Sequence, residues 1–154
     1  MSSTELVAAA LARGMSLATA ESLTAGLVAA AIADVPGCSA VFRGGVVAYA
    51  TDIKGSVLGL RADALEHVVS EQVAGDLALR ACEVLDADLG ISTTGVAGPD
   101  PLDDQPPGSV WIAVHDRPNS LTRTEHLALT GDRRQIREAA AAAAIDLACR
   151  TLAV

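Results

Sequence analysis

The feature that most constrains the fold of this chain is an apolar core with almost no aromatic side chains. Hydrophobic residues make up 51% of the 154 residues, yet the chain has only one Trp, one Tyr and one Phe. Ala, Val, Leu and Ile must therefore fill the core, and small side chains let helices approach a sheet closely. We expect alanine-rich helices packed on Val- and Ile-rich strands, in a single domain over residues 1–154.

Strand and helix patterns alternate along the chain and end in two neighbouring strands. Helices are expected over 4–12 and 24–34, from 70, and from 132, with one or two short helices within 51–68. Strands are expected over 16–20, 41–50, 88–94, 108–115 and 120–129. This order predicts an α/β three-layer sandwich, with a mostly parallel sheet, an antiparallel pair and helices on both faces. Gly44-Gly45 in the second strand indicates a bulge or a close approach of the backbone.

Charge and cysteine content narrow the classes of partner. The formal net charge of −8 argues against a nucleic-acid partner, because nucleic-acid-binding proteins carry basic surfaces. The N-terminus does not resemble a secretory signal, and no segment approaches the roughly 18–20 apolar residues of a membrane span. Three irregularly spaced cysteines and three scattered histidines fit neither a disulfide framework nor a metal site. We expect a cytoplasmic protein with a small-molecule partner, no membrane partner and no metal.

The turn over residues 20–26 is the first candidate for chemistry. It joins a strand to a helix, and ligands of open α/β sheets bind beyond the carboxyl ends of strands. Ser22 and Thr24 supply hydroxyl groups there, and Gly26 lets the backbone come close to a ligand. From spacing alone, Ser22 is better explained as a helix N-cap, and Glu21 as a first-turn acid that complements the helix dipole.

A second loop follows the strand over 88–94. Thr94, Gly95 and Gly98 lie in it as in phosphate-cradling turns, but the loop matches neither standard nucleotide-binding motif. A tight turn with glycine at positive φ explains these residues equally well.

Three further positions carry charge or a polar ring. Lys54 is the only lysine and follows Tyr49, the only tyrosine, by five residues. A desolvated lysine can act as a general base, whereas a solvated lysine is the simpler interpretation. Arg133 and Arg137 share one helix face, suited either to a phosphate or carboxylate or to a solvated basic patch.

Taken in order, these motifs resemble the CinA C-terminal domain family, which includes stand-alone nicotinamide mononucleotide deamidases. The resemblance covers nearly the whole chain and is carried by Ala20-Glu21-Ser22-x-Thr24-x-Gly26, Gly45-x-x-x-Tyr49-x-x-x-x-Lys54, Val69-Ser70-Glu71, Thr94-Gly95-Val96-Ala97-Gly98-Pro99-Asp100, Pro107-Gly108-Ser109-Val110-Trp111 and Gly131-Asp132-Arg133-x-x-x-Arg137. It implies hydrolysis of the nucleotide's carboxamide to nicotinate mononucleotide and ammonia, in pyridine nucleotide recycling. No metal or cofactor is implied, and we expect a homodimer or higher homo-oligomer.

The resemblance also assigns roles to individual residues. Ser22 is the expected nucleophile, with Lys54 as its base and Tyr49 as the other candidate for that role. The expected substrate-binding residues are Glu21, Thr24, Gly26, Thr94, Gly95, Gly98, Arg133 and Arg137.

The chain departs from the family pattern at four positions. The family turn commonly reads Ala-Glu-Ser-Cys-Thr-Gly-Gly, whereas this chain has Leu23 and Ala25 in place of the Cys and the first Gly. Pro101 and Gln105 replace a frequent glycine and a frequent lysine in the second loop. These departures leave two alternatives open: a catalytically silent nucleotide-binding module, and an amidohydrolase for a related amide.

Overall fold

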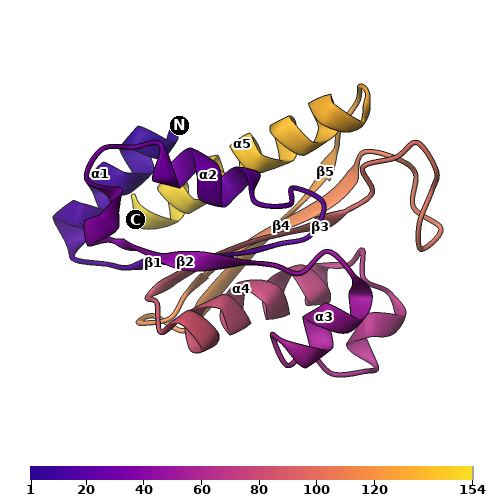
Figure 1. Ribbon diagram of the computed structural model, residues 1–154, viewed down its shortest axis with the longest axis horizontal. Helices are drawn as coiled ribbons and strands as arrows, with labels where there is room; N and C mark the ends of the chain where they lie inside the picture. The colour runs from indigo at the N-terminus through magenta and orange to yellow at the C-terminus, as the bar shows by residue number, and fades with distance from the viewer. Residues whose placement is uncertain (154) are drawn as a thin grey trace.

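The computed structural model describes residues 1–153 and is built around one five-stranded sheet (Figure 1). The strand order is β2-β1-β3-β4-β5. β1 pairs parallel with β2 and β3, whereas β4 pairs antiparallel with β3 and β5. The strands are β1 (Leu17–Glu21), β2 (Phe42–Val47), β3 (Leu89–Gly95), β4 (Ser109–Asp116) and β5 (Leu121–Ala128). The sheet is therefore mixed, with parallel pairing on one side and antiparallel pairing on the other.

Helices cover both faces of the sheet, which confirms the predicted α/β fold class. In Figure 1, α1, α2 and α5 lie on one face, and α3 and α4 lie on the other. The helices are α1 (Ser3–Arg13), α2 (Leu27–Ala33), α3 (Thr51–Ser56), α4 (Glu71–Leu85) and α5 (Arg133–Leu152), with short 3₁₀ helices at Cys38–Ala40 and Ala64–Glu66. Within residues 1–153, no helix combines the length and apolarity needed to cross a membrane.

Short polar motifs fix where the long helices begin. Ser2 and Glu5 form a capping box at the start of α1, and Asp132 and Gln135 form another at the start of α5. The Ser70 side chain accepts a hydrogen bond from a backbone N–H in the first turn of α4. The capping box of α5 has a consequence for the site, because it sets the helix start from which two arginines project.

Glycine lets α4 lie directly on the sheet. A Cβ at Gly90 of β3 would lie 1.9 Å from the carbonyl oxygen of Ala78 and 2.9 Å from Sγ of Cys82. Ala78 and Ala81 of α4 are fully buried. Small side chains therefore replace bulky ones at this interface, as the scarcity of aromatic residues predicted.

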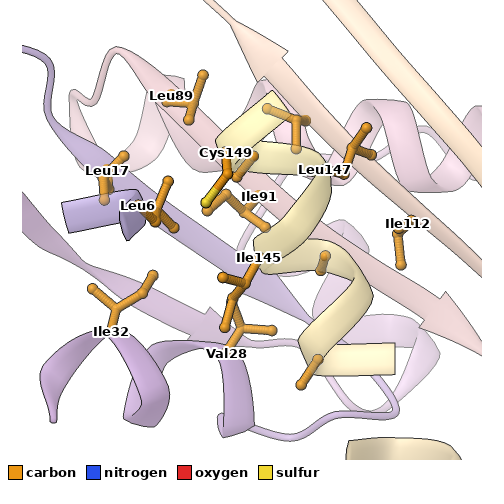
Figure 2. Packing of buried hydrophobic residues seen from close by; sticks show 14 of the residues in the cluster. Leu6, Leu17, Val28, Ile32, Leu89, Ile91, Ile112, Ile145, Leu147 and Cys149 are labelled. Carbon is orange, nitrogen blue, oxygen red and sulfur yellow. The ribbon is translucent and has the colours of Figure 1, made fainter. Parts of the chain in front are cut away.

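Aliphatic side chains fill the opposite layer (Figure 2). There α1, α2 and α5 meet β1, β3 and β4 through Leu6, Leu17, Val28, Ile32, Leu89, Ile91, Ile112, Ile145, Leu147 and Cys149. Burying one Leu or Ile side chain contributes about 1.5–3 kcal/mol. This cluster fixes α2 and α5 relative to the sheet, and both helices border the site described below.

The glycine pair in β2 serves both purposes that the sequence suggested. Leu17 pairs with Phe42 and Ala18 pairs with Gly44, so the register shifts by one residue at a bulge. A Cβ at Gly45 would lie 2.2 Å from Oγ1 of the buried Thr19. The bulge and the close approach together allow β2 to pack beneath α2.

Candidate active site

The candidate site lies where the carboxyl ends of three parallel strands meet. Because β2, β1 and β3 run in the same direction, the segments that follow them leave the sheet at one edge. These segments are residues 48–50, the turn 22–26 and the loop 96–108, and the start of α5 lies at the same end of the molecule, to the right in Figure 1. They enclose a cavity of about 170 Å³ lined by Ser22, Leu23, Tyr49, Gly95, Val96, Ala97, Gly98, Asp100, Leu102 and Arg133.

Ser22 and Lys54 meet beside this cavity. Nζ of Lys54 donates to Oγ of Ser22 at 3.0 Å, to the carbonyl oxygen of Ala48 at 2.8 Å and to that of Tyr49 at 3.3 Å. Lys54 is only 1% exposed, whereas Ser22 is 9% exposed. Among the described residues no carboxylate forms an ion pair with Lys54. The amine is therefore surrounded by three uncharged oxygen atoms.

This environment favours the neutral amine. Burial lowers the pKa of Lys54 because the charged form loses its hydration. A neutral amine has two N–H bonds and one lone pair. With the N–H bonds donated to the carbonyls of Ala48 and Tyr49, the lone pair faces Ser22, whose hydroxyl then donates to Nζ. That is the arrangement in which an amine can take the proton of a nucleophile.

The start of α2 differs from the prediction. The helix begins at Leu27, three residues after the expected start, and Gly26 occupies the N-cap position without any side-chain cap. Ser22 therefore does not cap the helix, so the interpretation that spacing alone favoured is wrong. Its hydroxyl is free to face the cavity and Lys54.

Glu21 binds the free N–H groups at the start of α2, which a capping serine was expected to do. Its side chain is 1% exposed and lies at the start of α2, where a carboxylate complements the helix dipole, although Glu21 is the last residue of β1 and not a first-turn acid as predicted. The carboxylate accepts hydrogen bonds from the Thr24 hydroxyl at 2.6 Å and from the backbone N–H groups of Gly26 at 3.0 Å, Val28 at 3.0 Å and Ala29 at 2.8 Å. These N–H groups are consequently already engaged by protein.

Thr24 and Gly26 also hold the turn from below. Oγ1 of Thr24 lies 2.8 Å from Oγ1 of Thr93 as well as binding Glu21, and Gly26 has φ of 97°, a conformation that suits glycine. Neither residue lines the cavity, nor does Glu21. The structure thus places these three expected substrate-binding residues behind the turn 22–26, where they hold its conformation.

Tyr49 and Arg133 lie at the edge of the cavity. Arg133 donates through Nη1 to the carbonyl oxygen of Gly98 and through Nη2 to the Tyr49 hydroxyl. Tyr49 is 52% exposed, and only its backbone carbonyl contacts Lys54. Of the two candidate bases, Lys54 is therefore the one hydrogen-bonded to Ser22.

The remaining expected site residues separate into two groups. Gly95, the last residue of β3, and Gly98, in the loop after it, both line the cavity. Thr94 is 1% exposed and donates to the carbonyl oxygen of Val68 at 2.6 Å, away from the cavity. Arg137 does not line the cavity either, and its guanidinium binds the backbone carbonyl groups of Leu23 and Thr24 in the turn 22–26.

Sequence reasoning missed several contributors. Asp100 and Leu102 line the cavity from the loop after β3, whose position at the carboxyl end of a strand was the available signal. The carbonyl groups of Ala48 and Tyr49 orient Lys54, and no side chain in the sequence marks them.

The described residues contain no group of three or more His, Cys, Asp or Glu side chains placed to hold a metal ion. His115 contacts Thr122, and His126 contacts Ser109. In the β4–β5 register, Thr122 and Trp111 are their respective partners, so the two histidines lie at opposite ends of the strand pair.

Comparisons with known proteins identify the family of this chain. The model of the CinA C-terminal domain family matches residues 2–152. A CinA-like protein of Frankia casuarinae is 45% identical over 143 residues, which cover 92% of this chain and 33% of that protein. The chain therefore spans about a third of the length of the curated relatives it matches.

Solved structures show the same fold. A CinA superfamily protein of Klebsiella pneumoniae superposes with a TM-score of 0.93 at 32% identity, covering 98% of this chain and 95% of that one. A competence/damage inducible protein of Agrobacterium tumefaciens gives 0.92 at 29% identity, covering 99% and 93%. Sequence and structure thus place this chain next to the same set of proteins.

Proposed function

This chain belongs to the CinA C-terminal domain family, and from that membership and its pocket geometry we propose that it deamidates nicotinamide mononucleotide. Water hydrolyses the carboxamide, giving nicotinate mononucleotide and ammonia. Ser22 is the nucleophile and Lys54 is its base. The observation that carries the proposal is the 3.0 Å contact between Lys54 Nζ and Ser22 Oγ in a buried setting without a carboxylate partner.

The reaction proceeds in two halves through an acyl-enzyme. Oγ of Ser22 attacks the carboxamide carbon while Nζ of Lys54 takes the hydroxyl proton. Lys54 then gives this proton to the amide nitrogen, the C–N bond breaks, and ammonia leaves Ser22 esterified with the carboxyl group of nicotinate mononucleotide. In the second half, Lys54 takes a proton from water as the water oxygen attacks the ester, and returns it to Ser22 as the acid product leaves.

The size of the cavity supports a ligand of which only one end is enclosed. At about 170 Å³ it is smaller than the roughly 300–1,000 Å³ typical of sites that enclose a whole ligand. The carboxamide and ring occupy the cavity beside Ser22, and the ribose phosphate extends to its edge. Arg133 lies there and supplies a guanidinium for the phosphate.

Ammonia release from nicotinamide mononucleotide tests the proposal. We compare the parent chain with Ser22→Ala, with Lys54→Met, and with the control Ser56→Ala, which alters an exposed serine on the same helix as Lys54. Ser22→Ala should lower kcat by at least about 10⁴-fold. Lys54→Met should lower it by about 10²–10⁴-fold, and Ser56→Ala should leave it unchanged.

Two outcomes contradict the proposal in different ways. An active parent whose rate survives Ser22→Ala excludes Ser22 as the nucleophile. A parent that releases no ammonia, but whose melting temperature rises with nicotinamide mononucleotide, is a binding module. Mass spectrometry of a parent quenched during turnover should detect the nicotinate mononucleotide ester on the peptide that contains Ser22.

A further inference from the structure

We propose that Arg137 is a positioning residue that orients the peptide groups after Ser22, so that the N–H group of Leu23 can bind the oxyanion. This inference rests on the proposed function, since an oxyanion forms only if Ser22 attacks a carbonyl carbon. It replaces the direct contact with substrate that the sequence suggested for Arg137.

The contacts of Arg137 are made with the backbone of the nucleophile turn. Nε donates to the carbonyl oxygen of Leu23 at 2.8 Å, and Nη2 donates to that of Thr24 at 3.1 Å. The side chain is half-buried, does not line the cavity, and forms no ion pair within residues 1–153. A guanidinium that binds two successive carbonyl groups fixes the plane of each peptide.

Fixing the carbonyl groups also fixes the N–H groups. In a trans peptide the C=O and N–H bonds point in opposite directions, so holding the Leu23 carbonyl towards α5 turns the Thr24 N–H away from that helix. The Ser22 carbonyl accepts from the Ala25 N–H at 3.0 Å, which fixes the Leu23 N–H in the same way. No hydrogen bond among the described residues uses the N–H of Leu23 or of Thr24.

The position of the Leu23 N–H group suits an oxyanion. Leu23 lines the cavity and directly follows Ser22, and the residue after a serine nucleophile often donates its N–H to the oxyanion. Arg137 acts on this group through the Thr24 carbonyl, because that contact fixes the peptide whose Ala25 N–H binds the Ser22 carbonyl. The Ser22 N–H is already bound to the carbonyl of Thr93, at 3.1 Å, and Thr24 is fully buried, so the Leu23 N–H is the unbound donor of this turn beside the cavity.

The turn needs a support on this side. Ala25 has φ of 49°, a left-handed conformation that is unfavourable for any residue with a Cβ. Glu21 holds the turn from the side of α2, but its hydrogen bonds do not include the carbonyl groups of Leu23 and Thr24. Without Arg137, rotation of the peptides on either side of Thr24 relaxes the turn and moves the Leu23 N–H away from the oxyanion.

The experiment uses two readouts on the full chain, of which only one requires the proposed substrate. The first is the second-order rate of Ser22 phosphonylation by a fluorophosphonate, a reaction that uses the nucleophile and the oxyanion donors but not the nucleotide site. The second is kcat and KM for nicotinamide mononucleotide. The variants are Arg137→Ala, Arg137→Lys and the control Arg134→Ala, an exposed arginine on the same helix paired with Glu138.

We expect Arg137→Ala to lower both the phosphonylation rate and kcat by about 10–10³-fold, the range in which loss of one oxyanion donor falls. KM should change by less than about 3-fold, because no substrate contact is lost. Arg137→Lys should recover part of the rate, since a lysine can bind one carbonyl group. Added guanidinium ion should partly rescue Arg137→Ala, and Arg134→Ala should match the parent.

Three results overturn the inference. A higher KM for Arg137→Ala with unchanged kcat makes Arg137 a substrate ligand. A parent that is phosphonylated on Ser22 no faster than Arg137→Ala shows that the turn keeps its geometry alone. A parent that is not phosphonylated at all removes the nucleophile and therefore the proposed function as well. If Arg137→Ala does not fold, the same comparisons are made on Arg137→Lys.

Discussion

The buried carboxylate of Glu21 allows a direct test of how the nucleophile turn is held. Its Oε2 accepts from the Thr24 hydroxyl and from the N–H groups of Gly26 and Val28, whereas Oε1 accepts only from Ala29. In Glu21→Gln the amide oxygen can keep the three bonds at Oε2, but the NH₂ group then faces the Ala29 N–H. Losing one hydrogen bond to a charged group costs about 1.5–3 kcal/mol, and losing the anion at the helix start costs about 0.3–1 kcal/mol. The free energy of unfolding should therefore fall by roughly 2–4 kcal/mol.

Urea denaturation of the parent and of Glu21→Gln measures the difference in the free energy of unfolding, and thermal denaturation measures the change in melting temperature. At about 2–4 °C per kcal/mol for a chain of this size, the melting temperature should fall by about 4–16 °C. Glu66→Gln, at an exposed position, is the control and should stay within about 0.5 kcal/mol of the parent. A Glu21→Gln variant as stable as the parent would refute the reasoning. If that variant also had a raised KM for nicotinamide mononucleotide, Glu21 would be the substrate ligand that the sequence resemblance implied.

Four further predictions concern the turn, the core and two titrating groups. Ala25→Gly should raise the free energy of unfolding by about 1 kcal/mol in urea denaturation, because glycine tolerates φ of 49°; an unchanged or lower value contradicts the strain. Gly90→Ala places a methyl group 1.9 Å from the Ala78 carbonyl oxygen and should cost more than about 3 kcal/mol, so a parent-like melting temperature contradicts the close packing. Burial raises the pKa of Cys82 to about 12, so its thiol should resist iodoacetamide at about pH 8 in folded protein and react in urea; rapid labelling of folded protein contradicts this. Burial lowers the pKa of Lys54 below its unfolded value, so the unfolded chain binds more protons between the two values and stability rises with pH there. Lys54→Met should reduce this increase of the free energy of unfolding with pH, and a curve parallel to that of the parent contradicts the prediction. Above about pH 9 the raised pKa of Cys82 makes the free energy of unfolding fall with pH in both chains, so the two are compared at equal pH.

Most of the fold follows from local patterns in the sequence. The alternation of strands and helices, the capping residues and the glycine pair of β2 all act over short distances, so the sequence shows them directly. The start of α2 does not follow in this way. Its N–H groups are satisfied by Glu21, which precedes the helix by six residues and can reach it only because the turn folds back and buries the carboxylate. Ser22 and Thr24 have the residue types of a helix N-cap, but the buried Glu21 carboxylate binds the first N–H groups of α2 in their place.

The sequence allowed Ser22 and Lys54 to be selected as the central residues of the candidate site, but not the contacts that hold the turn around them. Ser22 and Lys54 stand out because one lies between a strand and a helix and the other is the only lysine. The roles of Arg137 and Thr94 depend on backbone carbonyl groups that lie 113 and 26 residues away, at Thr24 and Val68. Carbonyl groups are present at every residue, so a sequence gives no indication of which of them a side chain will meet.

The four departures from the family pattern fall where the proposed chemistry does not use the side chain. Ala25 affects the turn only through its backbone conformation, and Leu23 contributes a peptide N–H and a buried side chain that is 3% exposed. Gln105 binds Ser109 outside the cavity, and Pro101 does not line it although its two neighbours do. A catalytically silent module would have to lack a group that the proposed reaction requires. This chain keeps the Ser22 hydroxyl, the buried amine of Lys54, the unbound N–H of Leu23 and the Arg133 guanidinium at the edge of the cavity. On the proposed mechanism the departures change the strain in the turn and no reacting group, so we expect the parent chain to release ammonia.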